Sequence, residues 1–187
     1  MCAHQLVLGE MIDFITGETV VDTLDERARQ KIARFLVEEK GYLKDEIEAR
    51  QQIMLPVDGE TGIFKVDLVI RLADRAFMIL IFGPGSLVSR ERSAVAAARL
   101  VEGYEVPLAV VTNGEAAEVL ETRSGKVMAE GLEKIPSKAE ALQMLRGIRF
   151  ETLPEKRLAW ERRILYAFEV LAERECDEFT CRLNSGA

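Results

Sequence analysis

The sequence contains very little histidine and cysteine. His4 is the single histidine, and the cysteines are Cys2, Cys176 and Cys181. One histidine close to the first residue disfavours Ser-His-Asp and Cys-His catalysis, because both need a histidine base inside the fold. The cysteines are too few for a disulfide framework. Cys2 and His4 could join Cys176 and Cys181 in a zinc site, but their spacing is unlike a compact zinc finger, and we expect exposed thiols.

Long apolar runs are also absent. No run approaches the ~20 residues that cross a membrane, and residues 1–11 lack the basic stretch and apolar core of a signal peptide. We therefore expect a cytoplasmic protein with no membrane contact. The 187 residues are 48% apolar and 30% charged, which predicts one globular domain. With a net charge of −7, the chain needs a local basic patch to bind nucleic acid.

Periodic apolar residues predict a long amphipathic helix over residues 22–40. Asp22 or Thr23 can cap its start, and Thr23 with Glu26 has the spacing of a capping box. Gly41 follows as a C′ residue suited to the left-handed conformation.

Short β-type segments follow this helix. We expect strands at 52–55, where Pro56 ends the run, and at 64–70 and 77–82. The last is unbroken and apolar, as in a central strand covered on both faces. A helix with a face of small residues at 86–103, a strand at 106–112 and a hairpin over 119–128 come next.

Two further helices are predicted near the end of the sequence. Ser137 caps a short one, and another starts near Pro154, with Leu158, Leu165, Phe168 and Leu171 on one face. The whole order predicts an α/β fold, with helices flanking one mixed sheet.

Several of these segments match a family pattern. The match covers residues 22–121 and consists of 25–30 and 35–42, the strand Val66-Asp67-Leu68-Val69, the Pro84-Gly85 turn, an Ala-rich helix, and Val111-Thr112-Asn113-Gly114. In this order they resemble the N-terminal nuclease domain of type I restriction enzyme R subunits, and especially the small stand-alone proteins of that family. The resemblance implies a restriction-endonuclease-like fold. The expected parts are an N-terminal segment (1–21), the nuclease-like domain (22–146), and a C-terminal helix and tail on the same domain (147–187).

By resemblance, the fold cuts DNA with an Asp on one strand and a Glu-x-Lys on the next. Two carboxylates hold Mg²⁺, and the Lys stabilises charge or helps to activate water. Asp67 occupies the first position, but Ile81-Phe82-Gly83 stands where the Glu-x-Lys belongs. Because apolar residues cannot bind a hard cation, the resemblance implies a nuclease fold without its catalytic site, and we expect no cofactor.

Asp67 has two readings. It can be a remnant that is solvated or paired with a nearby Arg or Lys, and Lys65 on the same face of the strand is a candidate partner. Alternatively, a migrated acid completes a Mg²⁺ site. Glu91 on the following helix is the nearest such residue, and Glu26 on the first helix is another.

The last helix carries a basic cluster of Lys156, Arg157, Arg162 and Arg163. These side chains could contact phosphates, although interleaved glutamates are more typical of a solvated face. Trp160 could stack on a base or a partner, but core or helix packing is the favoured interpretation.

The favoured function is a catalytically degenerate nuclease-fold module that binds a protein partner or nucleic acid, linked to restriction or DNA metabolism. The alternative is a Mg²⁺-dependent DNA endonuclease that uses Asp67 and Glu91. The terminal helix also suits a homodimer.

Overall fold

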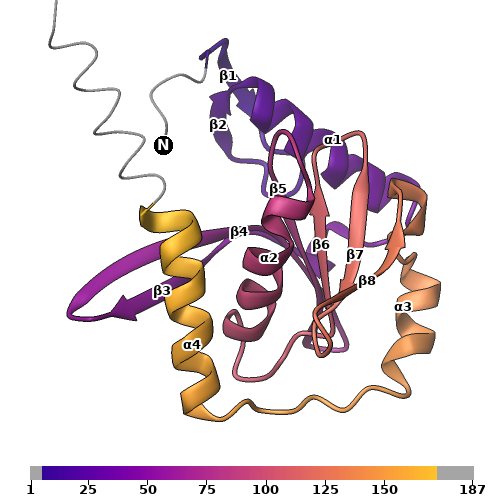
Figure 1. Ribbon diagram of the computed structural model, residues 1–187. Helices are drawn as coiled ribbons and strands as arrows, with labels where there is room; N and C mark the ends of the chain where they lie inside the picture. The colour runs from indigo at the N-terminus through magenta and orange to yellow at the C-terminus, as the bar shows by residue number, and fades with distance from the viewer. Residues whose placement is uncertain (1–5, 172–187) are drawn as a thin grey trace, which may run out of the picture.

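A six-stranded mixed sheet with helices on both faces forms the centre of the protein. The computed structural model describes residues 6–171 (Figure 1). The strands are β3 (Ile47–Val57), β4 (Glu60–Leu72), β5 (Arg75–Phe82), β6 (Leu108–Thr112), β7 (Ala117–Glu121) and β8 (Lys126–Glu130). Their order in space follows the chain, and neighbours are antiparallel except for β5 and β6, which are parallel. The prediction of a mixed sheet flanked by helices is therefore confirmed.

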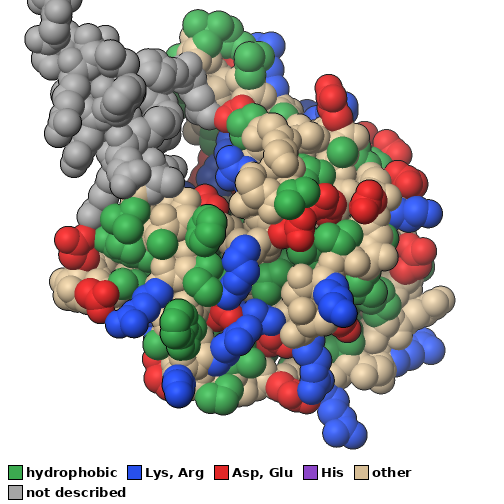
Figure 2. Space-filling model, in the orientation of Figure 1, with side chains coloured by type: hydrophobic (Ala, Val, Ile, Leu, Met, Phe, Trp, Pro, Cys, Tyr) green, Lys and Arg blue, Asp and Glu red, His purple; other side chains and the backbone are tan. Residues whose placement is uncertain are grey.

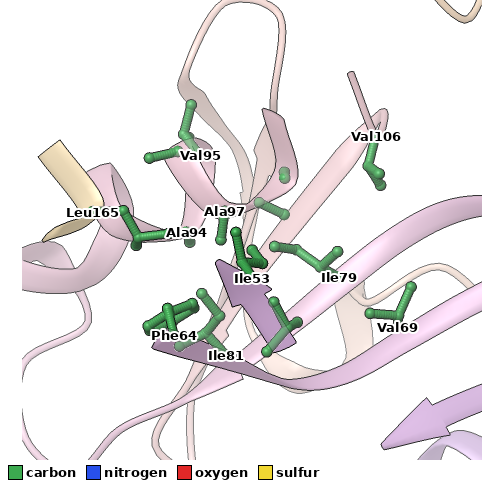
Figure 3. Packing of buried hydrophobic residues seen from close by; sticks show 14 of the residues in the cluster. Ile53, Phe64, Val69, Ile79, Ile81, Ala94, Val95, Ala97, Val106 and Leu165 are labelled. Carbon is green, nitrogen blue, oxygen red and sulfur yellow. The ribbon is translucent and has the colours of Figure 1, made fainter. Parts of the chain in front are cut away.

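The central strand β5 is buried from Ala76 to Phe82, as its unbroken apolar run predicts. One face of the sheet packs against α2 (Val88–Leu100) and α4 (Glu155–Leu165). The buried alanines of α2 include Ala94 and Ala97, whose small side chains let the helix lie close to Ile53 and Ile79 (Figure 3). The other face packs against α1 (Leu24–Glu38) and α3 (Lys138–Leu145).

Both ends of α1 follow the signals in the sequence. Thr23 is the N-cap, and its hydroxyl accepts a hydrogen bond from the Glu26 N–H at 3.0 Å. Gly41 lies at φ 77°, which a residue with a side chain rarely adopts. The helix is therefore held in one position along the chain, which fixes the direction of its polar side chains.

The β3–β4 hairpin is longer than predicted and extends past the rest of the sheet (Figure 1). Pro56 does not end β3, because the strand continues to Val57 and Pro56 is paired with Thr61. A proline is tolerated there because β3 is an edge strand, where one N–H of each residue pair needs no partner.

Three features of the fold are absent from the sequence-based prediction. Before α1 lies a small hairpin of β1 (Gly9–Ile12) and β2 (Thr19–Asp22), and short helical turns occur at Lys44–Glu46 and Leu132–Lys134. After α4, the chain continues as a π-helical turn over Tyr166–Leu171.

The π-helical turn corrects the predicted apolar face of the last helix. A π-helix bonds residue i to i+5, so α-helical spacing no longer predicts which side chains share a face. Leu165 and Tyr166 are buried, whereas Phe168 and Leu171 are 54% and 41% exposed. Trp160 is 58% exposed, so the predicted packing of its indole in the core is wrong.

Candidate functional site

Asp67 lies where β4 separates from β5. Pairing between these strands begins at Leu68, one residue further along β4. The Asp67 carboxylate accepts a hydrogen bond from the Phe82 N–H at 2.7 Å and another from Arg29 Nε at 2.5 Å. Asp67 therefore joins the end of β5 to α1 and is held in one orientation.

The surroundings of Asp67 act in opposite directions on its charge. Burial raises the pKa of the carboxyl, while Arg29 and the Phe82 N–H oppose that rise. The partner of Asp67 is Arg29 from α1 and not Lys65, which is exposed on β4. Pairing with a nearby Arg or Lys is one of the two interpretations of Asp67 that the sequence leaves open.

Packed apolar groups fill the segment Ile81-Phe82-Gly83, where the resemblance leads us to expect a Glu-x-Lys. Ile81 and Phe82 are buried, and the Arg29 guanidinium lies 5.2 Å from the centre of the Phe82 ring. At Gly83 a Cβ atom would lie 2.0 Å from Arg90 Nε, so the arginine covers this residue closely. No acid or base is supplied from this end of β5.

Glu26 is the acidic side chain nearest to Asp67 in the network, and its oxygens are already engaged. Glu26 Oε1 accepts from Gln30 at 2.8 Å and from Arg50 at 2.7 Å, while Oε2 lies 3.7 Å from Arg29 Nη1. A single guanidinium thus lies between Glu26 and Asp67. A hard divalent cation needs several free oxygen ligands, and the residues beside Asp67 do not fit one.

The polar network extends from Glu26 to the N-terminal hairpin. Asp13 binds Arg50 at 2.7 Å and Gln30 at 2.9 Å, and its other oxygen caps the N–H groups of Ile15 and Thr16. Burial alone would raise the pKa of Asp13, but these hydrogen bonds lower it to about 2. The network therefore ties the loop after β1 to α1, β3 and β4 beside Asp67.

Glu91 lies on α2, on the opposite face of the sheet from α1 and Asp67. Its carboxyl is next to that of Glu118 on β7, and burial together with Glu91 and Glu130 raises the pKa of Glu118. The structure therefore does not bring Glu91 and Asp67 together. Across residues 6–171, no three histidine, cysteine or acidic side chains are grouped as a metal site.

The basic cluster of α4 is largely paired with carboxylates. Arg162 pairs with Glu155, and Arg163 with Asp58 at 3.1 Å. Arg157 binds Glu161 at 2.8 Å, while Lys156 has no ion pair within the described part of the chain. Figure 2 shows Lys and Arg side chains interspersed with Asp and Glu on this face. The interpretation as a solvated, charge-balanced face fits this arrangement.

Glu161 is a buried residue that the sequence analysis treated as part of a solvated face. Its carboxylate is fully buried and bound by Arg92 at 2.5 Å, Arg99 at 2.9 Å and Arg157. These pairs attach α4 to α2. Arg29, Arg50 and Asp13 were likewise not singled out, and the four candidates Cys2, His4, Cys176 and Cys181 lie outside the described residues.

Comparison with protein families gives a match that agrees with the order of these elements. The family described as "Type I restriction enzyme R protein N terminus (HSDR_N)" matches residues 24–136, from the start of α1 to just before α3. The chain belongs to this family. Neither the curated proteins nor the solved structures compared with it give a match. Among the helices within residues 6–171, none has the length and apolar character to span a membrane.

Proposed function

We propose that this protein is a non-catalytic, restriction-endonuclease-like module of the type I restriction family, linked to restriction or DNA metabolism. It acts in the cytoplasm by binding a protein partner or nucleic acid rather than by cutting DNA. Membership of the family supports the connection to restriction. Ile81-Phe82-Gly83, standing where the resemblance implies a Glu-x-Lys, supports the loss of catalysis.

The observation that carries this proposal is the pairing of Asp67 with Arg29. The guanidinium supplies the positive charge beside the carboxylate that a metal ion would otherwise supply, at an Nε–Oδ1 distance of 2.5 Å. The buried Ile81 and Phe82 contribute no second carboxylate and no lysine. Each Asp67 oxygen already accepts one hydrogen bond, Oδ1 from Arg29 and Oδ2 from the Phe82 N–H, and neither Ile81 nor Phe82 offers a side chain that could activate water.

The decisive experiment measures cleavage and metal binding together. Labelled single- and double-stranded DNA is incubated with the protein in Mg²⁺ and in Mn²⁺, beside an Asp67→Asn variant that keeps the shape of the side chain. We expect no cleavage by either protein, and no Mn²⁺ binding in a titration followed by electron paramagnetic resonance. Cleavage that disappears in Asp67→Asn would overturn the proposal and establish a metal-dependent endonuclease. Cleavage shared by both proteins would indicate a contaminating nuclease.

A further inference from the structure

The exposed face of α1 carries charges of both signs in a regular order. Leu24, Lys31 and Glu38 are spaced seven residues apart, and seven residues are close to two helical turns, so they lie along one line of the helix. Arg27 and Arg34 repeat in the same way beside them. This line therefore runs from an apolar start through a basic middle to an acidic end.

Two of these charges have no partner within residues 6–171. The Lys31 and Glu38 side chains are exposed and form no ion pair or hydrogen bond there. By contrast, Arg27 binds Asp22 at 2.7 Å and Arg29 binds Asp67. Lys31 and Glu38 are thus available to a second molecule, whereas Arg27 and Arg29 are committed to ion pairs and Arg34 lies over the Phe14 ring of its own chain.

The surface beside this line of residues is concave. A groove of ≈ 420 Å³ is lined by α1 on one side and by other segments opposite, and the residues used here are Met11, Lys31, Arg34, Phe35, Glu38 and Leu132. Its lining combines the apolar side chains of Met11, Phe35 and Leu132 with charged side chains of both signs. A groove with apolar residues and charges of both signs in its lining fits a helix of similar pattern better than it fits a polyanion.

We propose that the occupant is a second copy of this chain, with the two α1 helices antiparallel about a two-fold axis. With the axis between Arg34 and Phe35, Lys31 of each copy faces Glu38 of the second copy. The same patch then serves both copies, and each opposite-charge contact occurs twice. Sliding one helix by four residues would instead place Lys31 of one copy against Arg34 of the other. Repulsion between these like charges disfavours that alignment, so the charges select the alignment of the two helices.

The edges of the sheet are poor alternatives for joining two copies. In β3, Arg50 has φ 57° and Pro56 lacks an N–H, and both interrupt a regular edge. In β8, Met128 is left without a partner residue in β7, as in a β-bulge. Such features protect an edge strand against pairing with another chain. The helical face is therefore the surface on which a symmetric dimer is best accommodated.

A charge-swap experiment on the full chain tests the proposal. Sedimentation velocity under reducing conditions, which prevent cysteine cross-linking, is expected to show a species of twice 21.0 kDa at micromolar concentrations. Lys31→Glu and Glu38→Lys, each made alone, turn two attractive contacts into two repulsive ones and should raise the dimer Kd at least about tenfold. The double variant restores opposite charges and should return the Kd close to that of the parent protein.

Lys126→Glu on β8 is the matched control, because it makes the same change in charge on an exposed strand far along the sheet. Its Kd should equal that of the parent protein, and thermal melts should show that all variants fold. A protein that is monomeric at every concentration overturns the proposal. So does a dimer that the single substitutions leave unchanged, or one that the double variant fails to restore. None of these outcomes depends on whether the protein cleaves DNA.

Discussion

The Arg29 guanidinium and the Asp67 carboxylate form a 2.5 Å ion pair between α1 and the point where β4 leaves β5. Asp67 lies on β4, and Arg29 is supplied by α1, the helix that opens the family match. The pair converts a possible ligand into a structural contact. Its energetic consequence can be measured separately from any activity.

Replacing Arg29 with methionine should destabilise the protein by about 2–3 kcal/mol at neutral pH, because it leaves a buried carboxylate without its counter-charge. The pKa of Asp67 is raised in the folded state, so its ionisation opposes folding at neutral pH, and that cost disappears on acidification below the unfolded value of 3.8. Urea unfolding should therefore show a smaller loss near about pH 4 than at neutral pH. Arg149→Met, on an exposed loop, is the control. An equal loss at both pH values would mean that Arg29 acts only by packing.

The local signals in the sequence were sufficient for most elements of the fold. Thr23 and Gly41 mark the ends of α1 because capping and left-handed backbone depend on single residues. The unbroken apolar run of β5 predicted the central strand, because a strand covered on both faces needs apolar side chains at successive positions. The hairpin of β1 and β2 was missed because each strand has only four residues, too few for a clear alternation.

The polar contacts of the site could not be predicted in the same way. Arg29 and Asp67 are 38 positions apart, and Arg99 and Glu161 are 62 apart. Charges at such separations meet only after the sheet and helices are assembled, and a glutamate among arginines on a helix is usually solvated. The sequence alone does show that Ile81-Phe82-Gly83 supplies no Glu and no Lys, because that inference needs only the identity of the residues.

Asp13 should make the protein sensitive to acid. Its pKa is lowered from 3.8 to about 2 in the folded state, so it stabilises the fold above the unfolded value and loses that effect as pH falls through the folded value. Asp13→Asn should cost about 2 kcal/mol at neutral pH, and the difference from the parent protein should shrink between about pH 4 and pH 2. Urea unfolding across this range measures it. Asp45→Asn, at an exposed position, should follow the parent curve, and a difference that stays constant with pH would contradict the prediction.

Trp160 should report a solvent-exposed environment. It is the one tryptophan of the chain and is 58% exposed on α4, so its fluorescence needs no correction for other indoles. We expect red-shifted emission in the folded protein and efficient quenching by acrylamide, with little further red shift on unfolding. A blue-shifted emission that acrylamide hardly quenches would show that a partner or another segment covers the ring.

Glu161 should be the residue whose neutralisation most weakens the attachment of α4. Its buried carboxylate is bound by Arg92, Arg99 and Arg157, so Glu161→Gln leaves several guanidinium groups facing a neutral amide. Breaking a buried ion pair on one side costs about 3–5 kcal/mol. Urea unfolding should show a loss of this order, and hydrogen exchange should rise in α4 before it rises in β5. Glu155→Gln removes an exposed pair from the same helix and should change neither measurement. If the two variants behave alike, the buried cluster does not hold α4 to α2.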